Sequence, residues 1–95
     1  MMYLICEENH SNLCVTESYG NGIMWLIMNK WLDGSTVGVD EWGVEFEVRE
    51  VVKGCDENPF LILSHLIELQ SKEGIDAVAN WLETFGFSFV EIEVA

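Results

Sequence analysis

Carboxylates at alternate positions along two predicted strands have the most suggestive spacing in this sequence. Glu45 and Glu47 share one face of the first strand, and Glu91 and Glu93 share one face of the second. Carboxylates two residues apart on a strand lie about 6–7 Å from each other, which is similar to the phosphate spacing along a nucleic-acid strand. If the two strands are neighbours, their four carboxylates form an acidic array that fits a basic groove.

The loop before the first of these strands extends the array with Asp40 and Glu41, and Trp42 follows directly. An exposed Trp among acidic residues has the character of a binding hot spot. The alternative is a solvated outer sheet face, with Arg49 paired to one of the glutamates and Trp42 covering a sheet edge. The predicted partner-binding residues are Asp40, Glu41, Trp42, Glu45, Glu47, Glu91 and Glu93.

Catalytic chemistry finds little support in the sequence. Paired carboxylates act as acid and base only when an apolar pocket raises the pKa of one of them, and the local sequence supplies no such pocket. Cys55 precedes a predicted helix, where a thiolate is favoured, but His65 lies about two turns along that helix, too far away to activate the thiol. The motifs GxGxxG, GxxxxGK[ST] and GxSxG are absent. We therefore predict no enzymatic activity, no catalytic residue and no cofactor.

A metal site is the other chemistry to consider. Cys6, His10 and Cys14 are evenly spaced across a predicted hairpin and could converge at its base. Zinc sites normally take four ligands that come in tight Cys or His pairs, and this spacing provides no such pair. We interpret the three residues as two buried strand cysteines and a loop histidine, and we predict no metal site.

Net charge limits the possible partners. Seventeen acidic residues stand against four Lys and Arg, which gives a formal charge of −13. Such a chain repels nucleic acid and anionic membranes and is attracted to basic protein surfaces; the alternative is that the acidity serves solubility. The three cysteines are an odd number without a CxxC motif, and the sequence shows neither a secretory signal nor an apolar run long enough for a membrane span. We expect a soluble protein in the reducing cytoplasm.

Hydrophobic periodicity predicts an α+β fold, with residues 1–95 as a single compact domain. The predicted strands cover residues 2–7, 13–16, 43–53 and 87–94, and the predicted helices cover residues 18–32, 56–70 and 75–85. This order, β-β-α-β-α-α-β, predicts a small, mostly antiparallel sheet of about four strands with helices packed on one face.

Two of these segments leave alternatives open. Gly20-Asn21-Gly22 can also form a hairpin turn that leads into a buried strand over residues 23–29, although we favour the helix. The helix over residues 56–70 begins near Pro59, as suits a first helical turn, and it is apolar around more than half of its circumference. It is therefore either a central core helix or half of a protein–protein contact.

In size, acidity, aromatic content and lack of a catalytic motif, the chain resembles the small phage-encoded anti-CRISPR and anti-restriction proteins. The resemblance covers the composition of the whole chain, and no motif transfers a role to any residue. It implies a non-enzymatic, DNA-mimic-like inhibitor in the host cytoplasm. Such an inhibitor binds a basic nucleic-acid-handling protein, such as a nuclease effector, and contacts neither nucleic acid nor membrane itself. The alternative is a small structural or interaction module that is homodimeric through its apolar helix.

Overall fold

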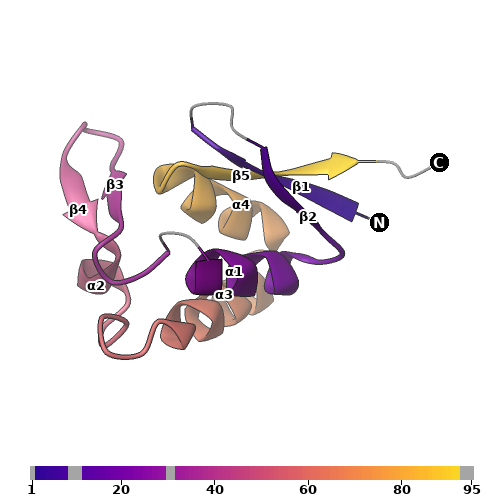
Figure 1. Ribbon diagram of the computed structural model, residues 1–95. Coiled ribbons are helices and arrows are strands. Elements are labelled where there is room, and N and C mark those ends of the chain that lie inside the picture. The colour runs from indigo at the N-terminus through magenta and orange to yellow at the C-terminus, as the bar shows by residue number, and fades with distance from the viewer. Residues whose placement is uncertain (1, 9–11, 30–31, 93–95) are drawn as a thin grey trace.

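The computed structural model describes residues 2–8, 12–29 and 32–92, and it confirms the α+β fold (Figure 1). Its elements in chain order are β1 (Met2–Glu7), β2 (Asn12–Thr16), α1 (Tyr19–Asn29), β3 (Val37–Val39), β4 (Glu45–Glu47), α2 (Val48–Val51), α3 (Phe60–Glu73), α4 (Ile75–Thr84) and β5 (Phe87–Ile92). The strand β1 pairs antiparallel with both β2 and β5, in the order β2-β1-β5, while β3 and β4 form a separate two-stranded ribbon.

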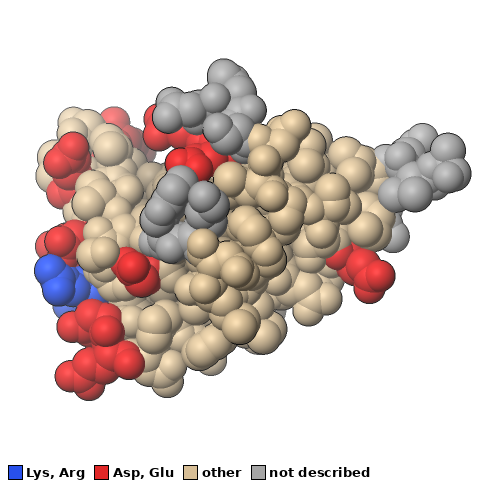
Figure 2. All heavy atoms as spheres, in the orientation of Figure 1, with Lys and Arg blue, Asp and Glu red and all other residues tan. Residues whose placement is uncertain are grey.

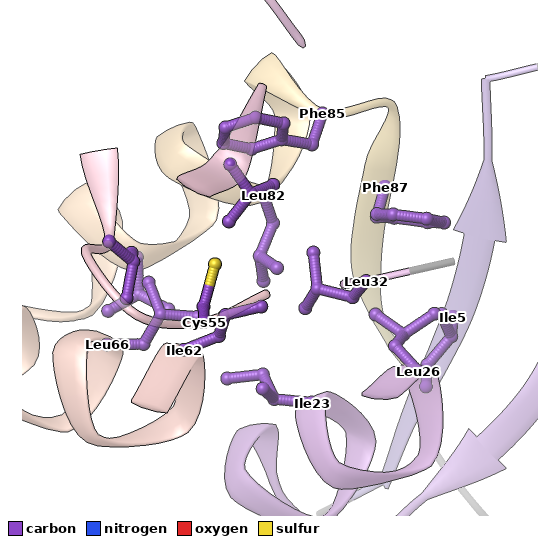
Figure 3. Packing of buried hydrophobic residues seen from close by; sticks show 13 residues of the cluster. Ile5, Ile23, Leu26, Leu32, Cys55, Ile62, Leu66, Leu82, Phe85 and Phe87 are labelled. Atoms are coloured by element: carbon purple, nitrogen blue, oxygen red, sulfur yellow. The ribbon is translucent and has the colours of Figure 1, made fainter. Parts of the chain in front are cut away.

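The helices α1 and α4 cover one face of the three-stranded sheet, α3 packs against both of them on the same side, and the β3–β4 ribbon lies with α2 at one end of the molecule (Figure 1). Side chains from the sheet and from these helices point toward one another in a common core (Figure 3). Ile5, Leu26, Ile62, Leu82 and Phe87 from β1, α1, α3, α4 and β5 are each at most 2% exposed. Burying these side chains is the main favourable contribution to folding, because transfer of apolar surface out of water drives compaction.

The helical interpretation of residues 18–32 is confirmed over α1, which begins directly after Ser18 and is described to Asn29; residues 30 and 31 lie outside the described residues, and Leu32 is not helical. The Ser18 hydroxyl accepts the backbone N–H of Asn21 at 3.2 Å, as an N-cap residue does. Gly22 has a packing role rather than a turn role, because a Cβ atom there would lie 2.5 Å from the Phe89 ring. The alternative of a hairpin turn at Gly20-Asn21-Gly22 is therefore wrong, and the second glycine instead lets the helix approach the sheet closely.

The two remaining predicted helices are also present, but α3 is less covered than expected. Pro59 directly precedes α3, and α4 ends before Gly86, whose φ of +88° is the left-handed conformation of a helix-terminating glycine. Only Ile62 and Leu66 of α3 are fully buried, whereas three further apolar side chains, those of Phe60, Leu61 and Ile67, stay exposed. α3 is thus an outer layer of the core and not its centre.

The predicted strand over residues 43–53 is mostly wrong. β4 covers only Glu45–Glu47, and the helical turn α2 follows at Val48. The Glu50 carboxylate accepts the backbone N–H of Glu47 at 2.6 Å, as in a capping box, and the Val52 N–H donates to the Val48 carbonyl at 2.8 Å. These local hydrogen bonds stop the strand although the alternation of apolar and charged residues continues. The predicted strands also omit β3, which lies just before the predicted strand over residues 43–53.

Candidate partner-binding surface

The structure divides the predicted acidic array between two separate sheets. Glu45 and Glu47 lie on β4, whose neighbour is β3, whereas Glu91 lies on β5, whose neighbour is β1. Glu93 lies outside the described residues. The expectation that these two strands are neighbours is therefore wrong, and a single four-carboxylate array does not form.

Five of the predicted residues do come together. Asp40, Glu41, Trp42, Glu45 and Glu47 all belong to residues 37–47, which we call the acidic hairpin: β3, its turn and β4. Carboxylates gather at the end of the molecule that Figure 1 assigns to β3, β4 and α2 (Figure 2). Eight of the seventeen acidic residues fall within residues 33–57: Asp33, Asp40, Glu41, Glu45, Glu47, Glu50, Asp56 and Glu57.

Hydrogen bonds fix the turn of the acidic hairpin. The Asp40 carboxylate accepts the backbone N–H groups of Trp42 and Val44, each at 2.9 Å. The Asp40 N–H donates to the Val44 carbonyl and the Gly43 N–H donates to the Asp40 carbonyl, each at 3.0 Å. Gly43 adopts a φ of +79°, which an L side chain would strain. The backbone of Trp42 is therefore held in place at the tip of the acidic hairpin, and 80% of the surface of this residue is exposed.

The two sides of the ribbon differ. On the inner side, the Phe46 ring centre lies 5.3 Å from that of Phe85 at the end of α4, and a Cβ atom on Gly38 would lie 2.7 Å from the same ring. On the outer side, Val37 faces Glu47 across the strands and Val39 faces Glu45. Both valines are about half exposed. The outer side thus presents an apolar strip next to an acidic strip.

Arg49 reduces the charge of one part of this surface. Its guanidinium forms an ion pair with the Glu47 carboxylate, as the alternative reading of the sequence expected. This hydrogen bond, followed by the attraction of the same carboxylate, raises the pKa of Arg49. The carboxylates left to meet a partner are chiefly those of Glu41 and Glu45, on either side of Trp42 in the chain.

The residues considered as zinc ligands do not converge on one site. Cys14 lies opposite Ile5 and packs against the core, whereas Cys6 lies opposite Asn12 and Ser88 on the other side of the sheet. His10 is outside the described residues. In the part of the chain that the structure describes, no group of three His, Cys, Asp or Glu side chains has a geometry that could hold a metal ion.

The structure does not arrange Cys55 and His65 as a nucleophile and its general base. Cys55 is fully buried within the core, and this burial, followed by the charge of Asp56, raises the pKa of its thiol, which disfavours the reactive thiolate. The His65 ring instead lies 6.0 Å from the ring of Trp81 at the edge of the core. Cys55 thus belongs to the core, and His65 packs at its edge.

Two adjoining hollows lie at the end of β1, in a place that sequence reasoning did not identify. Their volumes are about 420 and about 340 Å³, and they share Glu7, Glu8, Gly86 and Phe87 as lining residues. The first also contains Glu83, and the second contains Asp33, so their polar walls are acidic. The sequence signal was the pair Glu7-Glu8 directly after a strand.

Comparisons of the chain with protein-family models, with curated proteins and with solved structures find no match. Across the described residues, none of the helices is both long enough and apolar enough to cross a membrane.

Proposed function

We propose that this chain is a non-enzymatic acidic protein that binds a basic nucleic-acid-handling protein through the acidic hairpin and thereby inhibits it. The observation that supports this most is Trp42, a large apolar side chain that is 80% exposed on a hydrogen-bonded turn. An exposed Trp contributes little to the stability of a monomer. In an interface it supplies a large apolar contact with few rotatable bonds to immobilise, and central Trp residues commonly dominate binding energy.

The charge around Trp42 indicates the kind of partner. Glu41 and Glu45 are exposed near this side chain, and the outer side of the ribbon combines valines with glutamates. A complementary surface has an apolar pocket surrounded by Lys and Arg. Proteins that bind nucleic acids carry such basic surfaces to neutralise phosphates, so occupation of that surface excludes the nucleic acid.

The mode of binding differs from mimicry of a row of phosphates. Glu45 and Glu91 belong to different sheets, and Glu47 is paired with Arg49, so an apolar anchor with an acidic rim replaces an extended carboxylate array. The compositional resemblance to phage-encoded inhibitors favours a nuclease effector in the host cytoplasm as the partner.

The test uses purified CRISPR and restriction nucleases passed over the immobilised chain, followed by elution with salt or with duplex DNA. We expect one basic nuclease to be retained, to be released by about 0.5 M salt and to be displaced by DNA, because screened charges and an occupied basic surface both weaken the contact. Glu45→Lys should lower the affinity several-fold. Glu73→Lys, which makes the same charge change at the exposed end of α3, should not.

Two results would contradict the proposal. The first is a complex that withstands both high salt and competing DNA. The second is an equal effect of Glu45→Lys and Glu73→Lys, because only net charge and not the hairpin would then matter.

Self-association through α3 is a second candidate function. Phe60, Leu61 and Ile67 leave an apolar surface on this helix, and exposed patches of this kind commonly mark contacts with other proteins. If α3 is the contact, the purified chain should form a concentration-dependent dimer in sedimentation, and Ile67→Lys should abolish it.

A further inference from the structure

Beyond its base, the acidic hairpin packs against the rest of the molecule through few side chains. The base is fixed by the hydrogen bond from the Val48 N–H to the Thr36 carbonyl at 2.9 Å. Of the hydrophobic side chains within the hairpin, Phe46 packs against the core. The others are exposed: Val37, Val39, Trp42 and Val44. A two-stranded hairpin is only marginally stable by itself in water, so the orientation of this one depends on the contact that Phe46 makes.

Gly38 and Phe46 contact the same aromatic ring, that of Phe85. The two residues lie directly opposite each other on β3 and β4 and therefore share one side of the ribbon. The rings of Phe46 and Phe85 meet edge to face at an angle of 71°, which is a favoured geometry for two aromatic side chains. A Cβ atom on Gly38 would lie 2.7 Å from the Phe85 ring and 3.0 Å from the Thr84 carbonyl oxygen. Gly38 does not have a positive φ, so glycine is required here for space and not for backbone conformation.

The Phe85 side chain has little room to move away from the hairpin. It is 6% exposed and lies at the edge of the core next to Leu82 (Figure 3). Its ring centre is 4.5 Å from that of Trp81, and its backbone N–H donates to the Leu82 carbonyl at 3.0 Å, directly after the end of α4. Because closely packed side chains resist displacement, an atom added at Gly38 should displace the hairpin and not the ring.

This contact also decides which side of the ribbon faces outward. Successive residues of a strand point to opposite sides, so a pair of positions that faces Phe85 leaves the flanking pairs on the other side. Those flanking pairs are Val37 with Glu47 and Val39 with Glu45. The side chains that give the outer side of the hairpin its apolar and acidic strips are therefore presented by residues that lie on the inner side.

We propose that Gly38, Phe46 and Phe85 are positioning residues for the acidic hairpin: they hold it in one orientation against the end of α4 and thereby set its affinity for a partner. The role in binding rests on the proposed function of the hairpin, whereas the contact itself is a property of the chain alone. A surface that is already ordered in its binding orientation loses less conformational entropy when it associates. Loss of the contact should therefore weaken binding, although these three side chains lie on the side of the hairpin that faces the core.

The first test is amide hydrogen exchange of the purified chain and of two matched variants, each of which adds one methyl group to a glycine. Gly38→Ala should speed exchange in residues 37–47 about tenfold and leave β1 and β5 unchanged, which separates local loosening from global unfolding. Gly20→Ala should not speed exchange in the hairpin, because no atom lies within 4 Å of a Cβ at Gly20 and Ala favours the helix. Unchanged exchange of the hairpin in Gly38→Ala would overturn the proposal.

A double-mutant cycle tests whether Gly38 acts through Phe85. Phe85→Leu removes the ring atoms that a Cβ at Gly38 would meet, so Gly38→Ala should speed exchange of the hairpin less in Phe85→Leu than in the wild type. The same factor in both backgrounds would contradict a contact between the two residues. If Gly38→Ala does not fold, as judged by circular dichroism, Phe46→Leu takes its place in the cycle, because it removes the other ring of the contact.

The second test measures binding. For the nuclease that the wild-type chain retains, Gly38→Ala should lower the affinity about tenfold, and Gly20→Ala should leave it unchanged. A hairpin that loosens in Gly38→Ala while the nuclease affinity stays constant would overturn the positioning role, because the contact would then serve folding alone. The exchange measurements need no nuclease. If the wild-type chain retains none, the proposed function fails, whereas exchange still decides whether Gly38, Phe46 and Phe85 hold the hairpin.

Discussion

The acidic hairpin and the face of the three-stranded sheet opposite to the helices, which we call the outer sheet face, expose valines to nearly the same degree, but they differ in the residues around those valines. Val37 and Val39 of the hairpin are 49% and 50% exposed, close to the values for Val15 and Val90 of the sheet. Across the hairpin strands the valines face Glu47 and Glu45, whereas across the sheet strands they face Leu4. Apolar exposure alone therefore does not distinguish the two surfaces.

The carboxylates make the difference. A partner of the acidic hairpin must bring positive charge, since burial of Glu45 without a counter-charge would be unfavourable. The valines of the outer sheet face have no carboxylate directly opposite them, although Glu8 and Val90 line the same hollow. Higher salt should accordingly weaken binding at the hairpin.

The largest expected effect on this comparison comes from Trp42→Ala. Removal of a central aromatic anchor commonly costs 2 kcal/mol or more of binding free energy, so the affinity for the nuclease should fall by about 30-fold or more. The thermal midpoint should stay unchanged, because the residue is 80% exposed. Calorimetric binding and thermal unfolding of the same variant check both parts. An affinity that does not change would remove Trp42 from the interface.

The next effect is smaller and tests whether the hairpin must be rigid. Asp40→Ala removes the acceptor of the N–H groups of Trp42 and Val44, and Gly43→Ala strains the residue with a φ of +79°. Each should lower stability by about 1 kcal/mol and weaken nuclease binding, because an anchor that is no longer held in place must be ordered on binding. Self-association should not respond. The free energy of unfolding, obtained from urea titrations, and the nuclease affinity are the measurements.

If instead Asp40→Ala lowers stability while the nuclease affinity stays constant, the turn serves folding alone. Asp40→Asn is the matched control, because its amide oxygen still accepts hydrogen bonds and it removes only the charge.

Much of the fold could be predicted from local sequence pattern. The periodicity of apolar residues predicts the β1–β2 hairpin, the helices α1, α3 and α4, and the strand β5, because the apolar residues on one side of each element are buried in the core. The strand prediction fails after Glu47. The alternation of apolar and charged residues continues through Val48, but the hydrogen bond from the Glu47 N–H to the Glu50 carboxylate begins a helical turn. Periodicity reports which side chains can be buried together and does not report which local hydrogen bonds compete.

The candidate surface was predicted only in part, because sequence pattern reports local structure and not the pairing of distant strands. Asp40, Glu41, Trp42, Glu45 and Glu47 are close in sequence, so a local turn is sufficient to gather them. Glu91 depends on the pairing of strands that are distant in the chain, and such pairing is set by the whole core. The outer sheet face has the same dependence: alternation along β5 places Val90 and Ile92 on one face of the strand, but their alignment with Leu4 and Val15 requires the strand order β2-β1-β5.

The smallest expected effect concerns the link between the acidic hairpin and the rest of the molecule. The Asp33 carboxylate accepts the N–H and the hydroxyl of Ser35 at 2.8 and 2.7 Å, and the Asp33 N–H donates to the Thr36 hydroxyl at 3.0 Å. The Thr36 carbonyl in turn accepts the Val48 N–H at 2.9 Å. This turn therefore ties the beginning of β3 to the end of β4.

The pH dependence of that link has a defined sign. Burial by itself raises the pKa of Asp33, but the hydrogen bonds from Ser35 and Thr36 outweigh it, and the net pKa is lowered from the ordinary value of 3.8. A lowered pKa in the folded state means that the carboxylate stabilises the fold above the ordinary value, and that this contribution is lost as the pH falls through the folded-state pKa. Asp33→Ala should cost about 1 kcal/mol at neutral pH and much less at a pH below the folded-state pKa.

Urea titrations of the wild type and of Asp33→Ala across that pH range measure the difference. Nuclease affinity should fall slightly with the loss of the turn. An equal stability difference at neutral and acidic pH would mean that the space filled by the Asp33 side chain, and not its charge, holds the hairpin in position.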